Sequence, residues 1–253
     1  MTQARPATNR LVIGNKRYSS WSLRGWLAVR MAGLDVEETV IPLAGGGGTP
    51  AVKAATPSGT VPYLEHDGAR VWESSAICEY CAERAPGLWP GDRVVRAHAR
   101  SLSGEMHAGF RGLRSAMFFN AGCEFPGAGR TAEALADIAR VEAAWAEALG
   151  AYGGPYLFGR DFTLADAMFA PVAGRFLTWK PVRGSVGRAG GVAPPRLRDR
   201  RPVSTALALD HVGVAARDLG PIAAAYERLG FTLTPVARQS GRRAPDLPVE
   251  PYG

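Results

Sequence analysis

The sequence predicts a small α/β domain followed by an all-α domain. In the first third of the chain, short apolar runs with strand character alternate with helical periodicity and lead to a hairpin signal. From residue 92 to residue 179, long helical patterns follow one another without a strand candidate. A chain of 253 residues, 46% of them hydrophobic, is long enough to bury two modest cores.

The α/β part begins with a short apolar run at residues 11–13, which predicts a strand. A helical pattern from Trp21 to Arg30 follows it, and residues 36–43 alternate enough to predict a second strand. The four adjacent glycines at 45–48 predict a flexible loop, because they lack the strand-to-helix context of a phosphate-binding loop.

A hairpin is predicted next, with arms at 61–65 and 69–72 around the tight-turn pair Asp67-Gly68. A helix from Ser74 to Ala85 follows, and Pro86 ends it. The order βαβ then ββα mixes parallel and antiparallel strands with helices on either face. This order predicts a domain of the thioredoxin type over residues 10–87.

The helical domain is predicted over residues 92–179, with helices at 94–119, 130–152 and 164–179. The last helix has a clear start, because Thr163 and Asp166 stand at the spacing of a capping box, with Asp in the role usually given to Glu.

The formal charge of +7 comes almost entirely from residues 180–203, where seven basic residues stand against Asp199. This segment is also rich in Gly and Pro and has no apolar periodicity, so we interpret it as a solvated linker rather than a nucleic-acid arm. No apolar run approaches a membrane span, and the first ten residues are polar and lack the apolar region typical of a signal peptide. We therefore expect a cytoplasmic protein without membrane or nucleic-acid partners.

Three cysteines without an export signal predict free thiols rather than a disulfide framework. Cys78 and Cys81 have the spacing of a redox motif but fall inside a predicted helix, which favours a packing role. The histidines before residue 180 form no metal-ligand pattern, so no metal or organic cofactor is expected.

Four motifs, together with the order of elements, carry a resemblance over residues 10–179. They are Tyr18-Ser19-Ser20-Trp21-Ser22-Leu23-Arg24, Thr56 to Pro62, Glu73-Ser74, and Gly154 to Gly159 leading into Phe162 to Asp166. Jointly they resemble the glutathione transferase superfamily, nearest to bacterial serine-type members of the zeta and theta-like classes. The resemblance implies glutathione as co-substrate, a small electrophile as second substrate, a role in detoxification, and a homodimer.

Ser19 is the predicted catalytic residue. A free thiol has a pKa of roughly 8.5, and each unit of depression needs about 1.4 kcal/mol of preferential thiolate stabilisation. Ser19 stands where the first strand leads into the first helix, so its hydroxyl and the helix N-terminus can both stabilise a thiolate. Ser20 and Ser22 are close alternatives and Tyr18 a weaker one, and a purely structural role of Ser19 as N-cap stays open.

The resemblance also assigns the glutathione-binding residues. Val61-Pro62 matches a cis-proline pair whose first residue pairs with the cysteinyl backbone, and Ser74 and Glu73 match the residues that receive the γ-glutamyl carboxylate and ammonium. Thr60 departs from relatives, which often have Lys or Gln there, and this removes a contact to the glycine carboxylate. The full predicted binding set is Ser20, Trp21, Thr60, Val61, Pro62, Glu73 and Ser74.

The second-substrate pocket is expected between the first helix and the helix that begins after Asp92. Its candidate lining residues combine apolar and cationic side chains, and helical spacing makes about half of them core residues instead. They are Met106, His107, Phe110, Arg111, Arg114 and Phe118.

The expected activity is glutathione conjugation by direct thiolate attack. One alternative is a glutathione-binding protein without turnover, because relatives continue with further helices where this sequence turns into linker, leaving the helical domain incomplete. The other is an isomerase of the maleylacetoacetate type. Those isomerases carry cysteine where Trp21 stands, which argues against it.

Residues 204–253 resemble the opening of a glyoxalase-like domain of the vicinal-oxygen-chelate type, with a partial βαβ pattern. His211 matches a metal ligand of that superfamily, but one ligand does not make a metal site, and the segment carries no further His. We expect a truncated fragment.

Overall fold

The apolar run near the start of the chain forms a central strand of a mixed four-stranded sheet. β1 (Arg10–Ile13) pairs in parallel with β2 (Glu37–Val40) and antiparallel with β3 (Tyr63–His66), which pairs with β4 (Ala69–Trp72). The strand order is β2-β1-β3-β4. The predicted thioredoxin-type α/β fold is confirmed, as are the strands and the hairpin.

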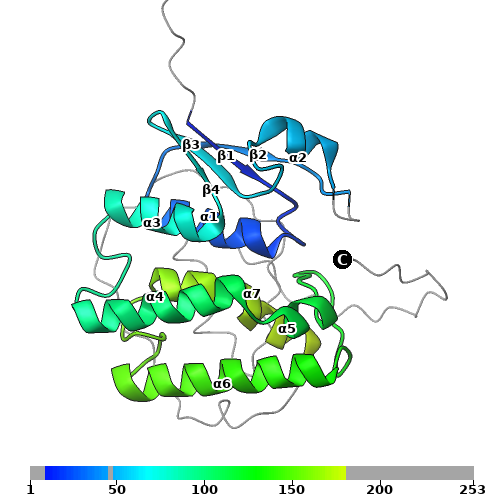
Figure 1. Ribbon diagram of the computed structural model, residues 1–253, viewed down its shortest axis with the longest axis vertical. Helices are drawn as coiled ribbons and strands as arrows, with labels where there is room; N and C mark the ends of the chain where they lie inside the picture. The colour runs from blue at the N-terminus through cyan, green and yellow to red at the C-terminus, as the bar shows by residue number, and fades with distance from the viewer. Residues whose placement is uncertain (1–8, 45–47, 181–253) are drawn as a thin grey trace, which may run out of the picture.

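Helices cover both faces of this sheet (Figure 1). α1 (Ser20–Met31) and α3 (Ser74–Arg84) pack on the face that presents Leu11 and Leu64. α2 (Pro50–Ala55) lies on the other face, where its Val52 joins a small separate core. The sequence pattern did not predict α2, because six residues are too few to show helical periodicity.

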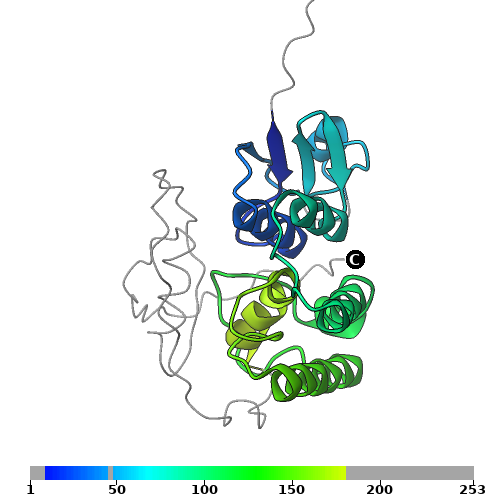
Figure 2. The ribbon, with the colours of Figure 1, turned by 90° about the vertical axis from the view of Figure 1, so that its left-hand side faces the viewer.

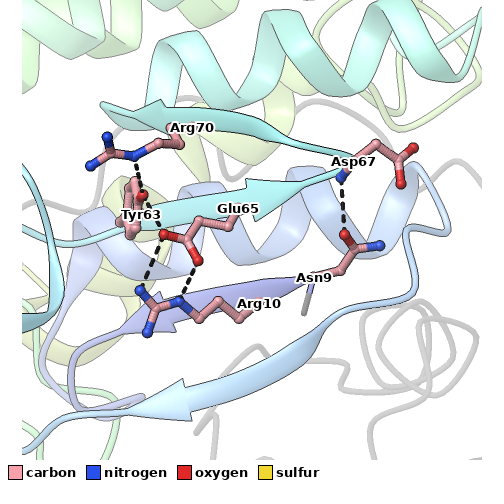
Figure 3. A network of polar contacts seen from close by, with 6 residues as sticks. All are labelled: Asn9, Arg10, Tyr63, Glu65, Asp67 and Arg70. Atoms are coloured by element: carbon pink, nitrogen blue, oxygen red, sulfur yellow. Dashed lines mark hydrogen bonds and ion pairs between the residues drawn. The ribbon is translucent and has the colours of Figure 1, made fainter. Parts of the chain in front are cut away.

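A charged ladder crosses three strands on the α2 side of the sheet (Figure 3). Arg10 on β1 pairs with Glu65 on β3, with Nε 2.6 Å from Oε2. Tyr63 donates its hydroxyl to Glu65 at 2.6 Å, and Arg70 on β4 donates to the Tyr63 oxygen at 3.0 Å. The hydrogen bonds from Arg10 hold the pKa of Glu65 below its usual value. Because a one-residue slip would move these groups to opposite faces, the ladder favours the observed register.

The second domain consists of α4 (Arg93–Ala108), α5 (Arg111–Ala116), α6 (Ala132–Tyr152) and α7 (Leu164–Trp179). Figure 2 shows these helices as a layer beneath α1 and α3. The predicted all-α domain is confirmed, and the structure describes residues 9–44 and 48–180. The glycine loop at 45–47, the linker from residue 181 and the fragment 204–253 with His211 therefore lie outside the described residues.

The single helix expected over 94–119 is wrong, because the chain breaks at Gly109 and Phe110. Phe110 adopts a left-handed backbone conformation with φ of 56°, and its buried ring faces Phe169. A Cβ on Gly109 would lie only 2.8 Å from the Glu105 carbonyl oxygen, so glycine is needed at this turn. After the break, α5 packs closely on α6.

The start of α7 is anchored by Asp166. Its carboxylate accepts hydrogen bonds from the Thr163 amide at 2.8 Å, the Thr163 hydroxyl at 2.8 Å and the Leu157 amide at 2.9 Å. The predicted capping box is therefore present. The same side chain also ties the preceding turn to the helix.

We predict that Asp166→Ala lowers the free energy of unfolding by about 2–3 kcal/mol, because it leaves two buried amides without an acceptor. Urea unfolding followed by tryptophan fluorescence measures this loss. Asp161→Ala is the matched control, since Asp161 is an exposed carboxylate five residues away. Equal losses of unfolding free energy in the two variants would contradict the role of Asp166 as the acceptor of these two amides.

Candidate functional site

The first turn of α1 is held by a pair of serine hydroxyls. Ser19 is the N-cap: its Oγ accepts from the Ser22 amide at 3.3 Å and donates to Ser22 Oγ at 2.8 Å. Ser22 Oγ also accepts from the Gly14 amide at 2.9 Å, which ties the helix to the end of β1. Ser19 therefore acts as the N-cap of α1, which is the structural role that the sequence analysis left open. Ser22 is turned into the protein, and Ser19 lies nearer to the surface at 7% exposure.

Ser20 and Trp21 follow the cap and meet positively charged groups. Ser20 Oγ accepts a long hydrogen bond of 3.5 Å from Nη2 of Arg175. The half-buried Trp21 ring lies against two guanidinium groups, with the Cζ atoms of Arg24 and Arg114 at 4.4 and 5.1 Å from its centre. The first turn of α1 therefore carries hydroxyl groups and lies beside positively charged side chains.

The Val61–Pro62 peptide bond is cis, as the sequence resemblance implied. Pro62 is buried against α1, where a Cβ on Gly25 would lie 2.7 Å from the proline ring, so this glycine allows the close approach. Thr60 is exposed, and its hydroxyl lies 2.7 Å from that of Ser58.

The start of α3 provides a second helix N-terminus. Ser74 is 1% exposed, and its hydroxyl lacks a hydrogen-bond partner among the described residues. Glu73 precedes it in a left-handed conformation with φ of 69°, which places the carboxylate outside the helix. The first amides of a helix have no partner within that helix, so this end is suited to a carboxylate ligand.

Two of the residues predicted to line the second-substrate pocket come to the same place. The His107 ring on α4 lies 5.3 Å from the Trp21 ring, and its Nε2 is 3.5 Å from Oε2 of Glu73. Arg114 on α5 reaches the Trp21 ring, as described above. His107 therefore links the helical domain to the start of α3.

The other pocket candidates lie elsewhere. Met106 is fully buried and Phe110 is nearly so, and both belong to the hydrophobic core. Both are therefore core residues, as the helical spacing allowed for about half of the candidates: Met106 lies on the buried face of α4, and Phe110 lies at the break before α5. Arg111 is exposed, and Phe118 packs against Phe125 and Trp179.

Sequence reasoning missed two functional candidates, Arg24 and Arg175. Both are buried, at 0% and 3% exposure. Arg24 ends the first motif of the resemblance and Arg175 lies on α7, so a local pattern gave no reason to place them together. The signal available in the sequence was an arginine at a helix position that faces the core. Arginine is rarely buried without a partner, so such a position deserves a functional explanation.

Polar atoms without partners are concentrated around this site. Within residues 9–44 and 48–180, seven buried side-chain nitrogen or oxygen atoms lack a hydrogen-bond partner. Five of them surround the starts of α1 and α3: Nη1 and Nη2 of Arg24, Nε of Arg114, Nδ1 of His107 and Oγ of Ser74. Buried polar groups are almost always satisfied in native proteins, so this concentration indicates a ligand site.

Other features of the described residues do not compete with this site. A groove of about 390 Å³ lies between the end of α3 and the start of α4, lined in part by Trp89 and Arg100, and none of the predicted site residues lines it. Cys78 and Cys81 are buried, and burial raises the pKa of the Cys81 thiol to about 12, which fits a packing role.

The described part of the chain holds no group of three or more His, Cys, Asp or Glu side chains placed to hold a metal ion. Among the helices of the described residues, none is long and apolar enough to span a membrane.

We predict that His107 titrates below the ordinary histidine value of about 6.5. Burial is the main cause of its lowered pKa; Glu73 opposes the shift, and Arg24 and Arg114 add to it. Because the folded pKa lies below the unfolded one, His107 contributes stability above about pH 6.5 that is lost as the pH falls.

An NMR titration of the His107 ring protons checks this. The pKa should fall further in Glu73→Gln and rise in Arg114→Gln. Movement in the opposite sense in either variant would show that the electrostatic assignment is wrong.

Comparisons with known proteins give the family of the chain. Residues 18–84 match the family model of the glutathione S-transferase N-terminal domain, and residues 128–203 match that of the C-terminal domain. The second match includes the segment 180–203 that we interpreted as a linker. A search among curated proteins gave no match.

Solved structures share the fold. A glutathione transferase homologue from Burkholderia gl BGR1, crystallised with bound glutathione, is 25% identical, with a TM-score of 0.50, over 67% of this chain and 82% of that one. Isozyme E7 of the Drosophila melanogaster glutathione S-transferase is 21% identical, with a TM-score of 0.50, over 67% and 77%. Maleylacetoacetate isomerase from Anaeromyxobacter dehalogenans 2CP-1 is 28% identical over 65% and 74%, with a TM-score of only 0.45.

The two family matches together cover more than half of the chain and are separated by the start of the helical domain. The chain therefore belongs to the glutathione S-transferase family.

Proposed function

We propose that this protein is a glutathione transferase that ionises the thiol of glutathione at the start of α1 and conjugates it to a small electrophile. The observation that carries the proposal is the set of five buried polar atoms without partners around the starts of α1 and α3. Glutathione suits such a site, because its γ-glutamyl carboxylate can accept a hydrogen bond from the Ser74 hydroxyl and its thiolate carries a charge opposite to that of the nearby Arg24 and Arg114. The relative from Burkholderia gl BGR1 was crystallised with glutathione, which supports the same ligand.

In this proposal Ser19 is the hydroxyl donor to the thiolate. In the structure, the Ser19 hydroxyl donates to Ser22 Oγ over 2.8 Å. A rotation of the Ser19 hydroxyl turns its proton toward a sulfur above the helix end, while Ser22 keeps its contact with Gly14. The thiol proton leaves to solvent, and the dipole of α1 favours the remaining negative charge.

The γ-glutamyl end of glutathione is proposed to bind at the start of α3. The unpartnered Ser74 hydroxyl and the free amides there suit the carboxylate, and the exposed Glu73 suits the ammonium. Val61 is proposed to pair with the cysteinyl backbone. Thr60 is exposed and short, so it makes a weaker contact with the glycine carboxylate of glutathione than a lysine would.

The electrophile is proposed to sit against Trp21, between α1 and the start of α5, with His107 and Arg114 beside it. The thiolate attacks the electrophilic carbon, the carbon–sulfur bond forms, and the leaving group departs with the bonding electron pair. We also propose that the protein acts in detoxification in the cytoplasm as a homodimer of the serine-type, zeta and theta-like classes, as the sequence resemblance implies.

We predict that Ser19→Ala lowers kcat/KM with glutathione and chlorodinitrobenzene by about 100-fold, because one donor to the thiolate is lost. Initial rates measured by product absorbance test this. Ser19→Thr should keep most of the rate, and Ser101→Ala, an exposed serine on α4, is the control for a surface hydroxyl.

If Ser19→Ala keeps the full rate and Ser20→Ala loses most of it, the hydroxyl donor to the thiolate is Ser20 rather than Ser19. Full rates in both would contradict the serine mechanism. Glutathione binding without product formation in the unaltered protein would support the alternative of a binding protein without turnover.

We predict that Ser74→Ala raises the Kd for glutathione by roughly 10- to 150-fold, the value of one hydrogen bond to a charged group. Isothermal titration calorimetry measures the affinity without any second substrate. Ser75→Ala, at the next position of α3, should leave the Kd unchanged. Equal effects in the two variants would place the γ-glutamyl end elsewhere.

A further inference from the structure

Three arginines from three helices converge on the first turn of α1. Arg24 on α1 and Arg114 on α5 place their guanidinium carbons 4.4 and 5.1 Å from the centre of the Trp21 ring. Arg175 on α7 donates to Ser20 Oγ at 3.5 Å. Ser20 and Trp21 directly follow Ser19, so all three charges lie behind the predicted thiol site.

Carboxylates do not neutralise this arginine cluster of Arg24, Arg114 and Arg175. In the described ranges 9–44 and 48–180, none of the three forms an ion pair. Arg24 donates to the Met168 carbonyl at 2.7 Å, and Arg175 to the Met117 carbonyl at 2.7 Å. Both nitrogens at the end of Arg24 lack a hydrogen-bond partner. Carbonyl groups orient a guanidinium but do not cancel its charge.

The arginines nevertheless stay charged at neutral pH. Burial, and next the charges of Arg175 and Arg114, lower the pKa of Arg24 to about 9. Burial, and next Arg114, lower the pKa of Arg175 to about 10. Holding several unpaired positive charges in a protein interior costs stability, which calls for a compensating function.

The proposed function accounts for the stability lost by burying these unpaired arginines. We propose that the arginine cluster supplies a permanent positive field that stabilises the glutathione thiolate at the start of α1, in addition to the serine hydroxyl; this inference rests on the proposed transferase function. Arg24 and Arg175 are almost completely buried behind Ser20 and Trp21, so they act through space and do not touch the ligand. They are positioning residues.

The other titratable and charged groups around this turn leave the field positive. Burial lowers the pKa of His107 on α4, which favours its neutral form, and burial raises the pKa of the Cys78 thiol on α3, which favours its protonated form. Glu73, before α3, has a side chain that is 55% exposed, so solvent screens it. Behind Arg114, the charges of Arg111 and Asp137 oppose each other.

Arg114 is the member of the arginine cluster that can be changed with least harm to the fold, because it is only partly buried. The pKa of the bound thiol is measured from the ultraviolet absorbance of the thiolate while the complex with glutathione is titrated, without an electrophile. We expect Arg114→Gln to raise this pKa by about half to one unit, since one charge is lost several ångströms from the sulfur.

Two further variants separate charge from shape. Arg114→Lys keeps the charge and should keep the thiol pKa within about 0.2 units of the unaltered protein. Arg93→Gln removes an exposed charge at the far end of α4 and should also leave the thiol pKa unchanged, because solvent screens it.

The outcomes distinguish this inference from the proposed function. If the unaltered protein binds glutathione with a lowered thiol pKa and Arg114→Gln has the same value, the field inference is overturned and the transferase proposal stands. The inference is also overturned if Arg114→Gln changes only KM for the electrophile, which would make Arg114 a substrate anchor. If the unaltered protein does not bind glutathione, both proposals fail.

Discussion

The structure depends on two arginines buried where α1 meets α7. Arg24 reaches from α1 to the Met168 carbonyl on α7, and Arg175 reaches from α7 to Ser20 and the Met117 carbonyl. The bonds from Arg24 to Met168 and from Arg175 to Ser20 cross the boundary between the α/β domain and the helical domain, and the bond from Arg175 to Met117 ties α7 to the end of α5. A hydrophobic contact alone would let the two layers slide, whereas directed guanidinium bonds fix α1 over α7. The position of the site follows from this fixed arrangement.

Because α1 is fixed in this way, its N-terminus lies next to residues from three other helices. Glu73 and Ser74 begin α3 on the same face of the sheet, and His107 and Arg114 approach from α4 and α5. The break at Gly109 and Phe110 is what allows Arg114 to reach Trp21, since it redirects the chain before α5. The site is therefore built at helix ends, where backbone amides and unpaired side chains are concentrated.

This arrangement costs stability in the ligand-free protein. Unpartnered buried groups such as Ser74 Oγ and the Arg24 nitrogens oppose folding, while the ladder of Arg10, Glu65 and Tyr63 and the cap at Asp166 favour it. Five of the seven unsatisfied buried atoms of the described residues lie at the site, and the other two are the indole nitrogens of Trp89 and Trp145. A ligand that brings carboxylates and a thiolate reverses part of this cost, which links folding to binding.

The sequence by itself determined the features that depend on neighbours along the chain. The strands, the Asp67-Gly68 turn and the Thr163 to Asp166 cap are local, because alternation, tight turns and caps are set within a few residues. The same holds for Ser19 at the start of α1. Helix α2 is local too, but it is too short to show a period.

Only the tertiary structure decided which distant residues meet. The break before α5 depends on the burial of Phe110 against Phe169 on α7, and the burial of Met106 depends on the face that α4 turns to the hydrophobic core. Arg24 and Arg175 are 151 positions apart in the sequence. A local pattern carries no information on such a pair, because the free energy that brings two buried charges together comes from the packing of whole helices around them.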